Sequence, residues 1–304
     1  MPSAEDGVSD PAAEEPALVR YYAGEISAEI ALMHLLLGAG GLEPLRRRLA
    51  ALAAAMPDSG AVRRLIRLAN ERRCGLDRAS RLVEAGFAAA GSEGLHRDDA
   101  LGAIRAQFDQ AVAHSPEAAV ALYSLGDFEI LDRATAEIAA WLGQRGLLAP
   151  DCEVLDIGCG IGRIAGAIAP RIRSILGIDL SSGMIAEARQ RCAGLANAAF
   201  LCCNGCDLTE LSGRHFDLVL AVDSFPYLVA ADPEIAARHI RDSAALLRRG
   251  GCIAIFNYSY SGDLEADRRR VERLAGAHRL RVERAGAQDF SLWDGAAFLL
   301  RKPA

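Results

Sequence analysis

Three alternate glycines that follow an apolar run constrain the fold of this chain more than any other feature. The run Val154–Ile157 leads into Gly158-Cys-Gly160-Ile-Gly162, after which apolar residues recur at helical spacing. This order predicts a buried strand, a tight turn and the start of a helix. Glycine allows positive φ and close approach of a ligand, and a helix start offers unpaired N–H groups. We therefore expect the loop to hold a polar or anionic small molecule.

Two kinds of cofactor are compatible with such a loop. Gly160-x-Gly162-x-x-Ala165 satisfies the loose dinucleotide pattern, and Asp179 lies near the distance expected for a ribose-binding acid. Taken alone, this pattern leaves a nicotinamide or flavin cofactor open. Asp156 shifts the balance, because the string Asp-x-Gly-x-Gly-x-Gly that it begins resembles motif I of the class I S-adenosylmethionine-dependent methyltransferases.

The residues after the glycines extend this resemblance. Further strand patterns, separated by helical ones, lie at 174–179, 199–203, 216–222, 252–256, 280–284 and 296–301. The resemblance covers roughly residues 120–304. It implies an α/β domain at 121–304 with a Rossmann-like, seven-stranded, mostly parallel sheet, one strand reversed, and helices on both faces.

The family resemblance implies S-adenosyl-L-methionine as cofactor and S-adenosyl-L-homocysteine as product. In the family, the acid in the position of Asp179 binds both ribose hydroxyls, since a carboxylate accepts two hydrogen bonds. An acid usually follows the third strand to receive the adenine amino group. Here Asn204 fills that position with Asp207 three residues later, so which of them contacts the adenine stays open. The expected cofactor-binding residues are Asp156, Gly158, Cys159, Gly160, Gly162, Arg163, Asp179, Leu180, Met184, Asn204, Gly205, Cys206, Asp207, Val222, Asp223 and Tyr123.

Catalytic candidates follow from the rule that ligands of this fold bind beyond the carboxyl ends of the strands. The loop after the fourth strand offers Asp223 as a base, with a helix cap as its alternative role, and Tyr227 beside it. His34 has the titration range of a base but lies on an apolar helix, where a packed histidine is the alternative. Arg163 is expected either to reach the methionine carboxylate or to form a surface salt bridge. The expected substrate contacts are Tyr21, Tyr22, Met33, Tyr227, Asn257, Tyr258 and Tyr260.

The sequence before residue 120 is predicted to form a separate helical region. The acidic segment 1–17, rich in Pro and Ala, is expected to be a disordered tail. Residues 18–120 are predicted to form an all-helical domain, with helices near 25–37, 44–56, 58–74, 77–90 and 96–113; Asp58 is the expected cap of the third. We expect this domain to cover the active site, to form a homodimer, or both.

Composition limits the partners and the compartment. The net charge is −6 and the arginines are scattered, so we expect no nucleic-acid surface. The sequence contains no stretch of eighteen uncharged apolar residues, so we predict no membrane span. The chain has 8 cysteines, several in predicted strands, which favours reduced thiols and a cytoplasmic location. Cys203-x-x-Cys206 lacks a second ligand pair, so no metal site is expected.

The leading hypothesis is a methyltransferase that acts on O, N, S or C of a small-molecule metabolite, in a biosynthetic pathway. Three alternatives stay open: an S-adenosylmethionine enzyme that does not methylate, such as one that cyclises the donor and releases methylthioadenosine; an NAD-dependent oxidoreductase; and a non-catalytic partner protein. The intact glycine loop argues against the last.

Overall fold

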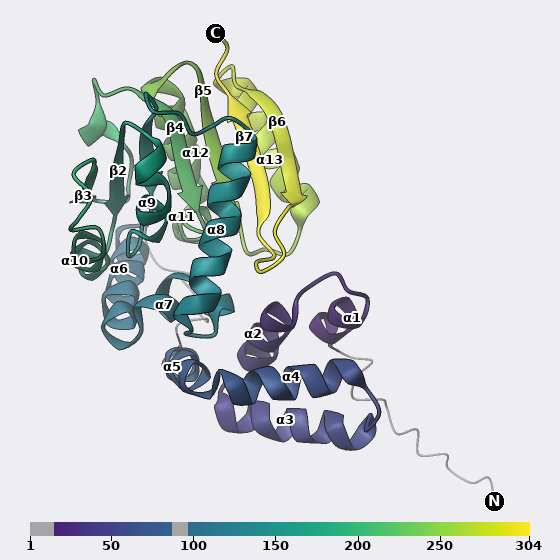
Figure 1. Cartoon of the computed structure of the whole chain (residues 1–304). Helices are drawn as coiled ribbons and strands as arrows, with labels where there is room; N and C mark the ends of the chain where they lie inside the picture. The colour runs from purple at the N-terminus through teal and green to yellow at the C-terminus, as the bar shows by residue number, and fades with distance from the viewer. Residues whose placement is uncertain (1–14, 87–96) are drawn as a thin grey trace, which may run out of the picture.

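The computed structural model describes residues 15–86 and 97–304, which form a helical region and a domain built on one sheet (Figure 1). The strand order is β3-β2-β1-β4-β5-β7-β6. Only β7 runs antiparallel to its neighbours, so six strands are parallel and one is reversed. The predicted fold is confirmed. The strands are β1 (Glu153–Ile157), β2 (Ser174–Asp179), β3 (Ala198–Cys202), β4 (Phe216–Val222), β5 (Leu247–Phe256), β6 (Arg281–Gln288) and β7 (Ala296–Arg301).

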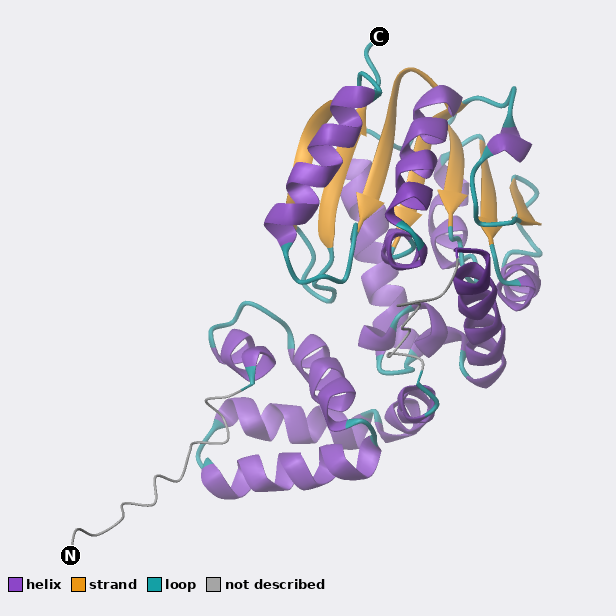
Figure 2. Ribbon diagram, turned by 180° about the vertical axis from the view of Figure 1, so that it is seen from behind, coloured by secondary structure: helices purple, strands orange, loops and turns teal. Residues whose placement is uncertain are grey.

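Helices cover both faces of this sheet, as the opposite views of Figures 1 and 2 show. Side chains alternate along the central strands, so Leu155 and Ile157 belong to one hydrophobic core and Val154 to the other. One face carries α8 (Phe128–Gln144), α9 (Arg163–Ile168), the 3₁₀ turn Ala169–Arg171 and α10 (Ser182–Arg191). The other carries the turn Thr209–Leu211, α11 (Phe225–Ala231), α12 (Pro233–Leu246) and α13 (Leu264–Ala277).

The helical region precedes the sheet, as predicted. Its helices are α1 (Pro16–Tyr22), α2 (Ala28–Ala39), α3 (Leu42–Ala55), α4 (Gly60–Glu71), α5 (Arg73–Glu84), α6 (Arg97–His114) and α7 (Pro116–Val120), followed by a 3₁₀ turn, Leu122–Ser124. Serine side chains cap three of them: Ser27 accepts from Ile30 N, Ser59 from Val62 N and Ser115 from Ala118 N.

Three sequence-based boundaries differ from the structure. Helix α1 begins at Pro16, inside the segment 1–17 that was expected to be disordered; residues 1–14 of that segment lie outside the described residues. The third predicted helix, 58–74, divides at Arg72, and Ser59 rather than Asp58 is its cap. His96, the expected start of a helix, and residues 87–90 also lie outside the described residues.

The helical region packs on the sheet domain at the edge where the parallel strands end. The strand arrows of Figure 2 point toward it, and one hydrophobic core runs from α1 through α5 into α8 and α9. The carboxyl edge of the sheet, where ligands bind in open α/β folds, therefore faces these helices. Among the described residues no single helix is long and apolar enough to cross a membrane; α2 and α3 meet that test as a pair bent by 117°.

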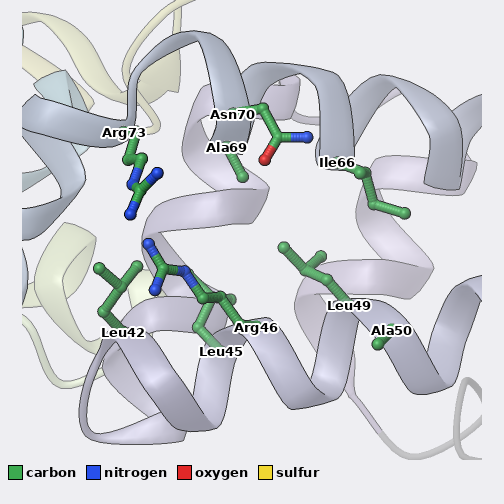
Figure 3. Close-up of a pocket in the computed structure, with 9 residues that line it drawn as sticks. All are labelled: Leu42, Leu45, Arg46, Leu49, Ala50, Ile66, Ala69, Asn70 and Arg73. Carbon is green, nitrogen blue, oxygen red and sulfur yellow. The ribbon is translucent and has the colours of Figure 1, made fainter.

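A small pocket lies within the helical region and is separate from this edge (Figure 3). It is formed by α3, α4 and the first residue of α5, and Arg46 and Arg73 point toward one another at one end. Its lining residues are Leu42, Leu45, Arg46, Leu49, Ala50, Ile66, Ala69, Asn70 and Arg73. None of the expected site residues lines it.

Candidate cofactor and active site

The loop between β1 and α9 is built so that only glycines fit at its alternate positions. Gly158, Gly160 and Gly162 have φ of 69°, 51° and 72°, values that residues with a Cβ rarely adopt. A Cβ on Gly158 would lie 2.3 Å from Cβ of Ser224. The N–H groups of Gly158 and Cys159 donate to the carbonyl of Ile178, which fixes the loop to the end of β2. The loop is thus a close-packed backbone cradle.

Asp179, the last residue of β2, is held against this cradle by backbone donors. Gly160 N donates to its Oδ2 and Ser181 N to its Oδ1, both at 2.9 Å. Burial raises the pKa of Asp179 to about 6, although these hydrogen bonds oppose the rise. Each carboxylate oxygen can accept a further hydrogen bond, so the fixed carboxylate suits a pair of neighbouring hydroxyls.

Asp156, beneath the glycine loop, is a buried carboxylate without a partner. Its exposed fraction is 1%, and neither carboxyl oxygen has a hydrogen-bond partner among the described residues. Burial raises its pKa to about 7, with Arg163 opposing the rise and Asp179 adding to it. Because buried polar groups in proteins are nearly always hydrogen-bonded, this carboxylate is a candidate partner for a donor on a bound molecule.

Arg163 is buried, so the surface salt bridge considered from the sequence is wrong. Its guanidinium donates to Thr135 Oγ1 at 3.0 Å and to the hydroxyl of Tyr123 at 3.2 Å. Tyr123 is also buried, and its ring lies 6.0 Å from that of Trp293. Arg163 and Tyr123 therefore form one buried polar pair near Asp156, between the helical region and α9.

The ends of β4 and β5 carry a second polar cluster. Asp223 and Asn257 follow these neighbouring strands, and both have positive φ, 60° and 63°. Asn257 Nδ2 donates to Asp223 Oδ1 at 2.9 Å, and the Tyr260 hydroxyl donates to the same oxygen at 2.7 Å. Such unusual backbone conformations persist where the surroundings impose them, and they gather at functional sites. The cluster fixes the direction of the Asp223 carboxylate.

Aromatic rings surround this carboxylate. Tyr227 lies edge-to-face on Tyr260, with 5.8 Å between ring centroids, and on Phe108 of α6, with 4.8 Å. Burial raises the pKa of Asp223, and the hydrogen bonds from Asn257 and Tyr260 partly oppose this. Asp223, Tyr227, Asn257 and Tyr260, all expected site residues, are thus brought together.

The side chains that were expected to contact the adenine form hydrogen bonds within their own loop. Asn204 Oδ1 accepts from Cys206 N at 2.7 Å, and Asp207 accepts from both N–H and hydroxyl of Thr209. Leu180 lies against Gly205, where a Cβ would be 3.2 Å from its Cδ1. The assignment of Asn204 or Asp207 to adenine thus stays a prediction.

Within 15–86 and 97–304, Cys203 and Cys206 belong to no group of three or more residues able to hold a metal.

Several expected site side chains point elsewhere. Tyr258, expected at the substrate, is 1% exposed and packs in the core beneath α12 and α13, 6.0 Å from the ring of Phe225. Met33, expected at the substrate, and Met184 and Val222, expected at the cofactor, are buried core residues. The Tyr21 hydroxyl donates to Ala61 O on α4, whereas Tyr22 is 39% exposed. The position of Tyr258 in the core corrects its prediction as a substrate contact, whereas the roles of Met33, Met184 and Val222 stay predictions.

His34 pairs with a residue that the sequence did not suggest. Its Nε2 lies 3.0 Å from Oδ2 of Asp294, in the loop between β6 and β7. Burial would raise the pKa of Asp294, but the hydrogen bond and charge of His34 and the charge of Arg20 lower it below the ordinary value. The location of Asp294, although not its pairing with His34, could have been predicted, because the connection from a parallel β6 to an antiparallel β7 must lie at the carboxyl edge.

Asp109 on α6 is a second residue that sequence reasoning missed. Its Oδ1 accepts from the Ser181 hydroxyl at 2.6 Å and from Gly183 N at 2.9 Å, at the start of α10. It therefore fastens α6 beside the end of β2. A lone acid on a helix gives no sequence signal for such a contact.

Part of this sequence is similar to known proteins. Residues 154–251 match the model of a family described as a methyltransferase domain. The putative methyltransferase YqeM of Bacillus subtilis is 27% identical over 121 residues, 40% of this chain and 41% of that protein. Trans-aconitate 2-methyltransferase of Methylobacterium nodulans is 42% identical over 67 residues, 21% and 26% of the two chains. The chain thus spans less than half the length of these relatives.

Among solved structures, phosphoethanolamine N-methyltransferase 1 of Haemonchus contortus, in complex with phosphoethanolamine and S-adenosylhomocysteine, has a TM-score of 0.50 and 16% identity. The match covers 68% of this chain and 49% of that one. At this identity the likeness shows the fold. The match of residues 154–251 to a methyltransferase domain, together with the seven-stranded sheet, supports the resemblance to the class I S-adenosylmethionine-dependent methyltransferases, a family that uses S-adenosylmethionine.

Proposed function

We propose that this protein transfers the methyl group of S-adenosylmethionine to a small-molecule acceptor. The observation that carries the proposal is the buried Asp156 carboxylate, which has no partner among the described residues and lies beneath three glycines of positive φ. Burying an unpaired carboxylate is costly unless a ligand supplies the missing donor. The amino and hydroxyl groups of this cofactor are such donors.

The chain offers a residue for each polar part of the cofactor. Asp179 is the proposed partner of the ribose hydroxyls, since its carboxylate is fixed by Gly160 and Ser181. The pair of Arg163 and Tyr123 is the proposed partner of the methionine end, because a buried guanidinium suits a carboxylate. Asn204 and Asp207 are the candidates for the adenine.

The cofactor, when bound, supplies a methyl group on a positively charged sulfur, which is open to in-line attack by a lone pair. We assign Asp223 as the base that takes a proton from the acceptor. Burial raises its pKa and so makes it a stronger base than an exposed aspartate, and Asn257 and Tyr260 position it through Oδ1. Tyr227 and Tyr22 are candidate substrate contacts, and His34, paired with Asp294, is the second candidate base.

Incubation with methyl-labelled S-adenosylmethionine and a library of small metabolites, followed by mass spectrometry, tests this function. Equal amounts of S-adenosylhomocysteine and labelled product are expected, and Asp223→Asn should lower turnover without changing donor affinity. Release of methylthioadenosine would instead indicate the non-methylating alternative. A protein that neither binds S-adenosylhomocysteine nor consumes the donor would contradict the proposal.

A further inference from the structure

Asp223 carries a free carboxylate oxygen at the proposed reaction site. Its Oδ1 accepts both hydrogen bonds that the side chain receives, from Asn257 and Tyr260, and Oδ2 receives none among the described residues. Nor does any described lysine, arginine or histidine form an ion pair with it. By contrast, the nearby Asp294 is paired with His34 and lies 3.8 Å from Arg20. Asp223 therefore has an acceptor oxygen to which no described residue donates, and the buried Arg163 offsets its negative charge without forming an ion pair with it.

Aromatic rings lie beside the Asp223 carboxylate, and no lysine, arginine or histidine among the described residues is paired with it. Three aromatic rings pack against one another in a row. The ring of Tyr227 on α11 contacts that of Phe108 on α6 on one side and that of Tyr260, which follows β5, on the other. Tyr260 is 58% exposed although its hydroxyl donates to Asp223, so this residue borders open space. The faces of aromatic rings attract cations, and a carboxylate adds the opposite charge. The carboxylate itself would repel an anionic acceptor.

We infer that the acceptor is an amine, bound as its ammonium ion by Asp223 Oδ2 and the rings of Tyr227 and Tyr260. This inference rests on the proposed function and names its substrate class. The ammonium donates its proton to Oδ2, so an N–H bond breaks, an O–H bond forms, and the nitrogen keeps the lone pair that a methyl acceptor requires. Asn257 and Tyr260 remain bonded to Oδ1 throughout.

Three probes of one shape test the inference: 2-phenylethylamine, 2-phenylethanol and phenylacetate, each titrated into protein saturated with S-adenosylhomocysteine. A charge-assisted hydrogen bond predicts that the amine binds at least about tenfold more tightly than the alcohol and that phenylacetate binds least. Asp223→Asn should abolish this preference and keep the affinity for S-adenosylhomocysteine, which also reports that the variant is folded. Asp151→Asn, an exposed acid just before β1, should change neither.

Equal binding of amine and alcohol, or no binding of any probe at millimolar concentration, would overturn the inference while leaving the proposed function intact. A change in the ratio of S-adenosylmethionine to S-adenosylhomocysteine affinity in Asp223→Asn, with the amine preference unchanged, would also overturn it, because Asp223 would then balance the sulfonium charge. Failure of the wild type to bind S-adenosylhomocysteine would instead contradict the proposed function itself.

Discussion

Replacing Asp156 with asparagine should stabilise the ligand-free protein at high pH and weaken its binding of S-adenosylhomocysteine. The carboxyl group is 1% exposed and has no partner among the described residues, and burial raises its pKa to about 7. Its pKa in the unfolded chain is about 3.9. The folded protein therefore holds this proton more tightly, so the stability of the wild type falls as pH rises from about 4 to about 7.

The size of this loss of stability follows from the shift in the pKa of Asp156. Each pKa unit corresponds to about 1.4 kcal/mol, so the ionised carboxylate destabilises the ligand-free fold by about 4 kcal/mol relative to the neutral acid. About 3 kcal/mol of this appears between about pH 5 and pH 8. The asparagine amide is buried without a partner at every pH, as the neutral acid is at pH 5. We therefore expect similar stabilities at pH 5 and a variant that is more stable by about 3 kcal/mol at pH 8.

Urea denaturation of the ligand-free protein measures this difference. Trp141 and Trp293 are both buried in the sheet domain, so their fluorescence reports its unfolding. Asp151→Asn, which changes an exposed acid, is the matched control and should show no pH-dependent difference from the wild type. A difference between wild type and Asp156→Asn that does not change with pH would refute the reasoning.

Three further predictions concern the cofactor loop and the contact between the two parts of the chain. Asp179→Ala should weaken S-adenosylhomocysteine binding by about 2 kcal/mol or more in calorimetry, because charged hydrogen bonds are lost; unchanged affinity would remove Asp179 from the site. Gly160→Ala should lower both stability and ligand affinity, since φ is 51° and its Cβ would meet a side chain at 2.7 Å, whereas Gly166→Ala, with open space around it, should not. His34→Ala should increase hydrogen exchange of the loop containing Asp294, and unchanged exchange would show that their 3.0 Å contact does not hold that loop.

Local patterns were sufficient to predict the sheet and the cofactor loop. The strands around Val154 and Leu220 are apolar runs bounded by turn residues. Such runs can be recognised without knowledge of distant parts of the chain. Glycines at alternate positions allow the positive φ values that the loop has. The positions of Asp156 and Asp179 at strand ends follow from the same local reading.

Side-chain directions after the strands could not be predicted in this way. Alternation from Phe256 would put Tyr258 on the same face of the sheet, yet Tyr258 packs on the opposite face. The positive φ of Asn257 reverses the alternation at that point. Since asparagine gives only a weak signal for this conformation, the sequence placed Tyr258 at the substrate rather than in the core.

Contacts between distant segments were also beyond the sequence pattern. The pairing of Arg163 with Tyr123, of His34 with Asp294 and of Asp109 with the start of α10 joins residues 40, 260 and 74 positions apart. Each pairing depends on how the helical region packs against the sheet.

Calorimetric titration of S-adenosylhomocysteine and of NAD into the wild-type protein tests the central claim most directly, because it examines the glycine loop with the two cofactors that its sequence allows. We predict that one molecule of S-adenosylhomocysteine binds per chain and that NAD does not bind. Binding of NAD, or of neither ligand, would contradict the assignment of this loop to S-adenosylmethionine.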